Sequence, residues 1–234
     1  MEVKTLIQEV LSSMTLTLDI YAVRLSSSRY KCYTQNTQYL SKGTRITIDG
    51  NKWKVFNFSF NEWVLLEQDN HENGITAGVY TIAGPTFKFG KLKDVNAELQ
   101  KKQPKEINPL LWMLELLPRT KPQDKTTVIE TEGVVRLFFM NSASYKNYLT
   151  EDHYTQVIIP LTNVIKAFKA ALDDHRLSGL VYEVRRVNHA KFSTTSGGIT
   201  AGQEKSVLSY DDLSGIEIEY ELPIRIDLRC EERV

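Results

Sequence analysis

Apolar and charged residues alternate along the C-terminal part of the chain. Over residues 216–228 the even positions are apolar and most odd positions are charged. A period of two predicts a strand with one buried face. Pro223 predicts an edge position or a bend, because proline has no N–H to donate to a sheet. With residues 180–192 this strand is expected to form a long hairpin, 180–229, whose connection at 193–206 is rich in Ser, Thr and Gly.

Shorter patterns in the N-terminal part mostly favour strands. Apolar residues at helical spacing over 6–14 predict one amphipathic helix, and a strand at 15–25 is expected to follow it. Residues 44–60 predict a β-hairpin, because alternating runs flank the turn residues Asp49-Gly50-Asn51. The alternation then changes phase, which predicts a β-bulge near Val55.

Helical signals appear in the second half of the chain. Residues 94–101 predict a short helix capped by its first residue, and residues 108–118 predict a second helix bounded by Asn-Pro and Pro. The near-continuous apolar run at 134–139 predicts a central strand. After Thr150, apolar residues at three- and four-residue steps predict a long helix, which Pro160 kinks or restarts because it removes a backbone donor.

These elements together predict an α+β protein. We expect an antiparallel sheet packed by helices with a long C-terminal β-hairpin, and a β-rich domain added before it. The expected organisation is an N-terminal helix and strand at 1–27, a small barrel or sandwich at 28–90, and an α+β domain at 91–234 that carries the hairpin 180–229.

Composition and charge narrow the function classes. Lys plus Arg is 29 and Asp plus Glu is 29, so no global field attracts nucleic acid or an anionic membrane. Basic clusters at 101–105 and 119–125 are either solvated surface or a local lining for a DNA channel. No run is long enough to cross a bilayer. Cys32 and Cys230 lie far apart, which favours a reducing cytosol over a disulfide framework or a zinc site.

Two features of the sequence resemble ligand-binding sites: a glycine-rich segment and a set of histidines. The glycine-rich segment 197–203 has the spacing of a phosphate loop, but Gln203 stands where the lysine is needed, so a flexible hairpin tip is the better interpretation. The histidines fall in four separate expected elements without metal-ligand spacing, and they are His71, His153, His175 and His189. No cofactor, metal or small-molecule substrate is expected, although an enzyme with dispersed catalytic residues stays open.

The carboxylates Glu217, Glu219 and Glu221 share one face of the C-terminal strand. Paired carboxylates serve glycosidases, but strict alternation is more typical of a solvated face or of one side of a charge-complementary contact. We therefore predict an interface made by these carboxylates, by arginines further along the strand and by glycines of the hairpin tip: Glu217, Glu219, Glu221, Arg225, Arg229, Gly197, Gly198 and Gly202.

Segments in a fixed order resemble a family of virion proteins from tailed phages of gut Bacteroidetes, including crAss-like phages. They are Phe87-Lys88-Phe89-Gly90 followed by residues 94–100, then an apolar segment at 109–115, then residues 148–161 with an internal Pro-Leu. The resemblance implies a non-enzymatic neck or tail ring protein, such as a head–tail connector or a tail terminator, located in the virion and assembled in the host cytoplasm. By fold analogy, the order of strand, helix and long hairpin over residues 134–228 is also that expected of a tail-terminator-like α+β core.

The partners implied are further copies of the chain, which form a homo-oligomeric ring, and neighbouring neck or tail proteins. Non-specific contact with packaged DNA is a further expectation, and no membrane contact is expected. Long hairpins can pair across subunits by strand addition, and complementary Glu and Arg faces can set the register between copies. The alternative from another class is a carbohydrate-binding or adhesin module that uses Trp53, Trp63 and Tyr80 as stacking platforms.

Overall fold

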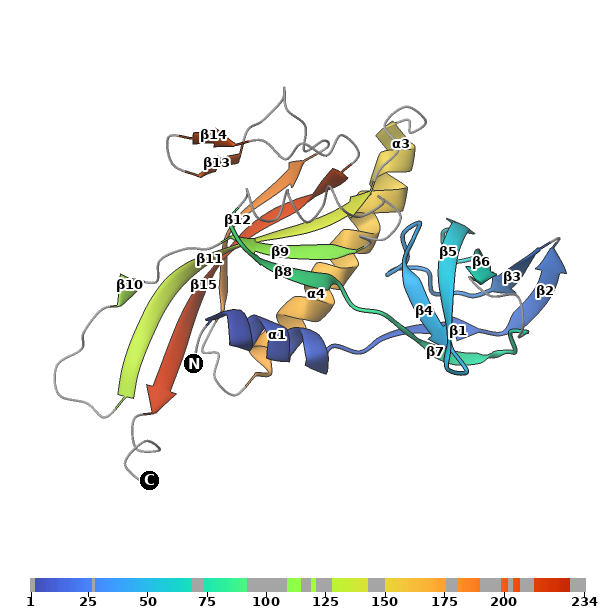
Figure 1. Ribbon diagram of the computed structural model, residues 1–234, viewed down its shortest axis with the longest axis horizontal. Helices are drawn as coiled ribbons and strands as arrows, with labels where there is room; N and C mark the ends of the chain where they lie inside the picture. The colour runs from blue at the N-terminus through green and yellow to red at the C-terminus, as the bar shows by residue number, and fades with distance from the viewer. Residues whose placement is uncertain are drawn as a thin grey trace.

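The computed structural model describes residues 3–26, 28–68, 74–91, 109–114, 119–120, 128–142, 150–175, 181–189, 199–201, 204–206 and 213–227. Within these residues the fold consists of two large β-sheets, one small sheet and two helices (Figure 1).

The first sheet is a curled, antiparallel sheet of seven strands in the order β1-β7-β4-β5-β6-β3-β2. Its strands alternate buried and exposed residues, so that one face packs inward and the other faces outward. They are β1 (Leu16–Ile20), β2 (Ala22–Ser26), β3 (Arg29–Tyr33), β4 (Arg45–Ile48), β5 (Asn51–Ser59), β6 (Trp63–Gln68) and β7 (Gly78–Ile82).

The second sheet has six strands, with the order β12-β15-β11-β9-β8 and with β10 paired to β11. All pairings are antiparallel except that of β8 with β9. The strands are β8 (Thr86–Gly90), β9 (Leu110–Leu114), β10 (Arg119–Thr120), β11 (Val128–Ser142), β12 (Tyr182–His189) and β15 (Leu213–Asp227), and the small sheet pairs β13 (Ile199–Ala201) with β14 (Glu204–Ser206).

Two helices accompany these sheets within the described residues. The first is α1 (Val3–Ser13), and the second is a continuous segment of α3 (Thr150–His153), a π-helical turn (Tyr154–Ile158) and α4 (Ile159–Asp173). Pro160 lies in the first turn of α4, where its missing N–H costs least. The helix continues through Pro160 without a break, and the winding changes from π-helical to α-helical just before it, where a kink or a restart was predicted.

The predicted fold class, α+β with a tail-terminator-like core packed by helices, is wrong. The described structure is mostly β, with a curled seven-stranded sheet beside a second sheet and only two helices. The N-terminal sheet is therefore half of the architecture, where the sequence patterns indicated an addition to an α+β core. Segment 1–27 contributes to both halves, because α1 packs on α4 while β1 and β2 belong to the seven-stranded sheet.

The helix predicted at 108–118 is also wrong where the structure describes it. Leu110–Leu114 form the strand β9, and every residue of that strand is buried. A short, wholly apolar run has no periodicity that separates a helix from a strand buried on both faces. The sheet makes this segment a strand, because β9 lies between β11 and β8 and has hydrogen-bond partners on both edges. The helix predicted at 94–101 lies outside the described residues.

The hairpin predicted at 44–60 is confirmed. Strands β4 and β5 meet at Asp49 and Gly50, whose φ angles of 49° and 80° suit a type I′ turn. The register against β6 shifts between Val55 and Asn57, which is the predicted bulge. Because of this shift Val55 and Phe58 both point inward although they are three positions apart, and Phe56 faces outward.

The predicted pairing of the C-terminal strand with residues 180–192 is confirmed, since β12 pairs antiparallel with β15. The central strand predicted at 134–139 is also confirmed within β11. Pro223 lies beyond the last residue of β15 that pairs with β12. Among the described residues, that side of β15 is an edge there, which agrees with the position predicted for the proline.

One continuous core joins α1, the inner face of the seven-stranded sheet and the helix-facing side of the second sheet. Phe168 of α4 is central to it, with its ring 5.5 Å from that of Phe139 and 6.4 Å from that of Tyr220. On the opposite face of the second sheet, Trp112 stacks on Phe138 at 4.6 Å and donates a hydrogen bond of 3.0 Å to the Gly90 carbonyl. The second sheet therefore buries apolar side chains on both faces.

A junction loop, residues 34–44, connects the two halves. Asn141 of β11 donates a 2.6 Å hydrogen bond from Nδ2 to the Ser41 hydroxyl, and both side chains are buried. Asn163 of α4 donates a 3.1 Å bond to the Gln38 carbonyl. A buried N–H donor needs an acceptor, so these two hydrogen bonds favour one placement of the seven-stranded sheet against the rest.

Gly215 marks a close approach of β15 to β11. A Cβ atom at this position would lie 2.1 Å from the Phe139 carbonyl oxygen. We expect Gly215→Ala to lower the free energy of unfolding by about 3 kcal/mol, because the backbone of a central strand has to move. Gly84→Ala is the matched control, since no atom lies within 4 Å of its added Cβ. Urea denaturation followed by circular dichroism measures both, and equal midpoints would contradict the prediction.

The Tyr220 hydroxyl is buried, and it has no hydrogen-bond partner among the described residues. Burial raises the pKa of this hydroxyl, so the group stays neutral. We expect Tyr220→Phe to raise the free energy of unfolding by about 1 kcal/mol, because an unsatisfied polar atom is removed. Tyr80→Phe is the opposite case, since the Tyr80 hydroxyl donates a 2.8 Å bond to the Thr76 carbonyl, and its loss should destabilise slightly. Urea titrations measure whether the free energy of unfolding rises in Tyr220→Phe and falls in Tyr80→Phe.

Candidate assembly surface

Strands β11 and β15 pair along their whole lengths, from Val128 opposite Asp227 to Ser142 opposite Leu213. Their neighbours cover only part of this ribbon, because β12 reaches no further than Glu221 and β9 pairs only with residues 137–140. The two strands run on together past β9 and β12, and of the described residues only the two-residue strand β10 pairs with this part of β11 (Figure 1). We call residues 128–133 and 222–227 the ribbon arm.

The predicted carboxylate row exists on β15, but a cation of the same chain occupies it. Arg136 of β11 places Nε 2.8 Å from a carboxylate oxygen of Glu219 and 3.3 Å from one of Glu217. Glu217 is only 5% exposed. Arg185 of β12 approaches Glu219 from the other side at 3.9 Å. Two of the three predicted contact carboxylates are thus engaged inside the chain, and Glu221 is the one nearest the ribbon arm.

Sequence reasoning missed Arg136. Its signal is a single charge within the apolar run at 134–139, where an ionised side chain needs a partner. The register of β11 against β15 supplies this partner directly, because Arg136 lies opposite Glu219.

Of the remaining predicted interface residues, only Arg225 lies within the described part of the chain. Arg225 lies in the ribbon arm, at the position opposite Glu130. Arg229 and the three glycines, Gly197, Gly198 and Gly202, lie outside the described residues. The interface assignment of these residues stays a prediction.

Strand β12 ends the second sheet and is exposed along most of its length. Tyr182 is 58% exposed and Val184 is 57% exposed, although both are large apolar side chains. A register shift between Glu183 and Arg185 leaves Val184 without a cross-strand partner in β15. On its other side β12 pairs with no strand among the described residues.

Charged side chains along β12 are held in defined positions. Arg186 donates two hydrogen bonds of 2.7 Å to the carboxylate of Glu183. These bonds raise the pKa of the Arg186 guanidinium, against a smaller opposing effect of burial. The edge thus presents an ordered ion pair beside the exposed apolar side chains.

The side chains of His153, His175 and Cys32 have structural surroundings, while His71 lies outside the described residues. His153 Nε2 lies 2.5 Å from the Ser214 hydroxyl, and burial lowers its pKa. His175 Nε2 lies 3.1 Å from a carboxylate oxygen of Glu9, which ties the end of α4 to α1. Burial raises the pKa of the Cys32 thiol to about 12, so it stays protonated at neutral pH. Within the described part of the chain, no three His, Cys, Asp or Glu residues gather as metal ligands would.

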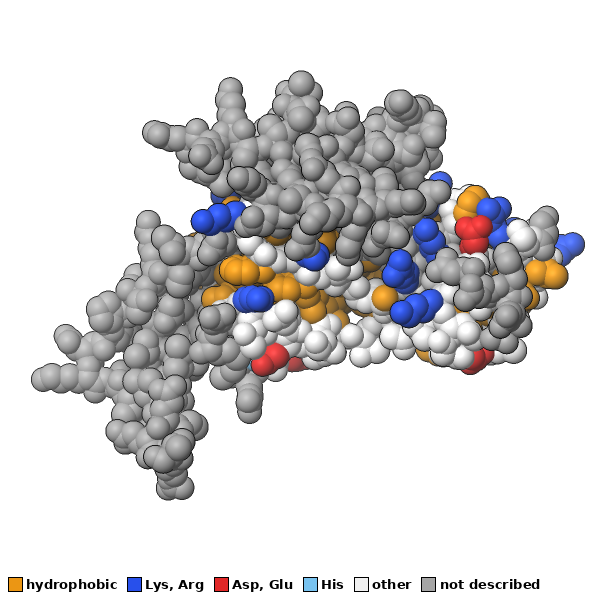
Figure 2. All heavy atoms as spheres, viewed as in Figure 1, with side chains coloured by type: hydrophobic (Ala, Val, Ile, Leu, Met, Phe, Trp, Pro, Cys, Tyr) orange, Lys and Arg blue, Asp and Glu red, His pale blue; other side chains and the backbone are white. Residues whose placement is uncertain are grey.

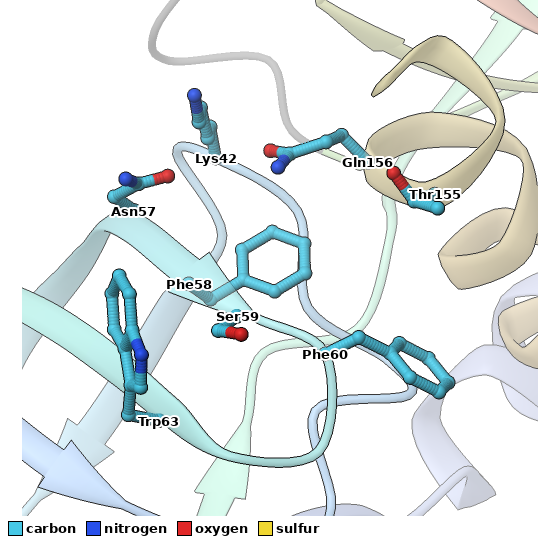
Figure 3. Close-up of a pocket in the computed structure, with 8 residues that line it drawn as sticks. All are labelled: Lys42, Asn57, Phe58, Ser59, Phe60, Trp63, Thr155 and Gln156. Carbon is cyan, nitrogen blue, oxygen red and sulfur yellow. The ribbon is translucent and has the colours of Figure 1, made fainter. Parts of the chain in front are cut away.

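A cleft of about 440 Å³ separates the seven-stranded sheet from the π-helical turn (Figure 3). Thr155 and Gln156 line it from the turn, and Trp63 lines it from β6. The rest of its lining comes from the loop before β4 and from the β5–β6 hairpin: Lys42, Asn57, Phe58, Ser59 and Phe60. These groups offer aromatic surface, amides, hydroxyls and one ammonium group.

Two of the three aromatic residues proposed as sugar platforms serve other purposes. Trp53 is buried and meets Tyr30 edge to face at 5.4 Å, and Tyr80 bonds to Thr76. Trp63 remains partly exposed beside the cleft.

No protein-family model matches the chain, and no curated protein matches it significantly. Among the described residues, no helix is both long and apolar enough to span a membrane.

We expect Arg136→Met to lower the free energy of unfolding by about 3 kcal/mol, because Glu217 and Glu219 then face each other in a buried site without the cation between them. Lys169→Met removes an exposed pair with Asp173 on α4, where the nitrogen–oxygen distance is 2.6 Å, and should cost below about 1 kcal/mol. Urea denaturation at neutral pH compares the two. Similar small losses in both variants would show that the Arg136 cluster is no more than a surface pair.

Proposed function

We propose that this protein is a structural subunit of a tailed-phage virion that assembles into an oligomeric ring in the neck or tail, as a head–tail connector or a tail terminator. The observation that carries the proposal is strand β12. It is an edge strand exposed along most of its length, with the apolar side chains of Tyr182 and Val184 more than half exposed.

Such an edge is costly in an isolated subunit. Unpaired strand edges with exposed apolar residues invite pairing with other chains, and proteins usually blunt or cover them. Strand addition from a second copy would bury Tyr182 and Val184 and would satisfy backbone groups at the same time. The displaced register at Val184 and the ion pair of Arg186 with Glu183 would restrict this pairing to a complementary edge.

The ribbon arm supports the same function. Beyond β12, only the two-residue strand β10 pairs with the arm among the described residues, so a neighbouring subunit can add strands to it. Glu221 beside the arm and Arg225 within it provide opposite charges that can set the register between copies. Repeated head-to-tail contacts of this kind close into a ring when the rotation between subunits allows it.

The placement in a phage particle is supported by the sequence resemblance. Of its segments, Phe87–Gly90 lies in β8, and the helical segment from Thr150 carries the internal Pro160-Leu161. The apolar segment at 109–115 contains the strand β9 instead of the helix of the family pattern. In this proposal the protein is located in the virion, is assembled in the host cytoplasm, and contacts copies of itself and neighbouring neck or tail proteins.

The edge can be tested with one substitution and a matched control. We expect Val184→Lys to shift the protein from oligomers towards monomers, because a lysine on the edge repels an added strand. Val79→Lys makes the same change at a valine that is 67% exposed on the seven-stranded sheet, and it should assemble like the parent. Mass photometry across a concentration series, with negative-stain images, measures the distribution.

A parent protein that stays monomeric at every concentration, alone and with candidate neck proteins, would contradict the proposed ring assembly. Oligomers that survive Val184→Lys unchanged would remove β12 as the contact.

A further inference from the structure

The outward face of β2, β3, β6 and β5 carries aromatic and basic side chains in alternation. The inward positions of β3 are taken by Tyr30 and the buried Cys32, so Arg29, Lys31 and Tyr33 project to the other side. Cross-strand register then places Arg24 beside Lys31, and Tyr33 beside Trp63. We call Arg24, Arg29, Lys31, Tyr33, Phe56 and Trp63 the outer face.

The cationic groups of Lys31 and Arg29 lie over aromatic rings on this face. The Lys31 ammonium lies 4.5 Å from the Trp63 ring centre and 5.5 Å from that of Tyr33. The Arg29 guanidinium lies 3.5 Å from the centre of the Phe56 ring. Both arrangements hold a positive charge close to a flat apolar surface, and they limit the conformations of long side chains that would otherwise be mobile.

The outer face continues into the cleft through Trp63, which belongs to both. Across the cleft, the side chain of Gln156 reaches towards Lys42 and Phe58 (Figure 3). The Gln156 amide oxygen is buried and has no hydrogen-bond partner among the described residues. A buried acceptor without a partner is costly, and a ligand with an N–H or O–H group would satisfy it.

The charge on this surface is positive although the chain as a whole is neutral. Lys and Arg side chains gather over the seven-stranded sheet in the view of Figure 2. Of the described carboxylates on β6 and its turn, Glu67 pairs with Arg29 at 3.2 Å and Glu62 accepts a 2.7 Å hydrogen bond from Ser59. The basic side chains around them are Arg24, Arg29, Lys31, Lys42 and Lys54.

A neutral sugar would use the aromatic rings but would gain little from cations seated on them. Single-stranded nucleic acid presents the matching chemistry, because flat bases alternate with phosphates along one flexible chain. In a duplex the bases stack on each other and are not free to lie on a side chain. We infer that the outer face and the cleft bind single-stranded nucleic acid. Trp63 and Tyr33 stack on bases, Arg24, Lys31 and Lys42 contact phosphates, and Gln156 accepts a hydrogen bond from a base in the cleft.

This inference does not rest on ring assembly, since none of its residues belongs to β12 or to the ribbon arm. The test uses the full chain and a fluorescein-labelled deoxythymidine oligonucleotide of about 20 nucleotides, followed by fluorescence anisotropy. We expect binding that weakens as salt rises, because bound phosphates release counterions. Lys31→Glu should weaken binding about tenfold or more and reduce the salt dependence.

Stacking is tested separately from charge. Trp63→Ala should weaken binding about tenfold at constant salt, while Trp63→Phe should keep most of the affinity. Lys166→Glu, at an exposed position on α4, makes the charge change of Lys31→Glu elsewhere and should bind like the parent. Circular dichroism melting of each variant shows whether the fold is retained.

Tryptophan fluorescence gives an independent measure. Trp53 and Trp112 are buried, so quenching by bound oligonucleotide reports on Trp63. We expect quenching in the parent and none in Trp63→Phe. Binding is expected to be weaker for a duplex of the same length and for dextran sulfate, a polyanion without bases.

No binding of the oligonucleotide would overturn the inference. So would equal affinity for dextran sulfate combined with no effect of Trp63→Ala, which would indicate charge alone. Retention on a glycan array in the absence of oligonucleotide binding would assign the face to sugars instead.

Discussion

The arrangement of the protein depends on the junction loop at residues 34–44. Its Ser41 hydroxyl accepts a hydrogen bond from Asn141 at the end of β11, and its Gln38 carbonyl accepts one from Asn163 of α4. Thr37 and Asn61 exchange two further bonds, which tie the same loop to the turn between β5 and β6. Apolar packing between the halves is tolerant of small rotations, whereas buried polar groups are satisfied in one arrangement only. The shape of the cleft follows from these bonds, because its two walls belong to the two halves.

The sequence patterns were informative where periodicity and turn chemistry agreed. The β4–β5 hairpin with its bulge and the pairing of β12 with β15 were both accessible, because each has a local signature. The apolar run of β9 had no such signature, and only its neighbours β8 and β11 made it a strand. The fold class was missed for a related reason: short strands far apart in sequence leave no local trace of the large sheet that they form.

The candidate surfaces likewise could be predicted from the sequence only where a local pattern exists. The alternation that predicted a row of carboxylates on β15 was correct about their common face, but it could not reveal that Arg136 would reach them from a strand more than eighty residues away. The outer face was not predicted, although Trp63 was one of the three aromatic residues considered as stacking platforms for a sugar. Its side chains come from four strands, and they become neighbours only through the cross-strand register.

The π-helical turn at Tyr154–Ile158 carries Thr155 and Gln156, which form one wall of the cleft. A π turn holds one more residue than an α turn, so a return to regular α-helix would rotate the preceding residues by about 100° relative to α4. That rotation would carry Gln156 away from the opposite wall. Occupancy of the cleft and the winding of this helix are therefore thermodynamically linked, and a molecule held there would also influence His153 and its hydrogen bond to the first residues of β15.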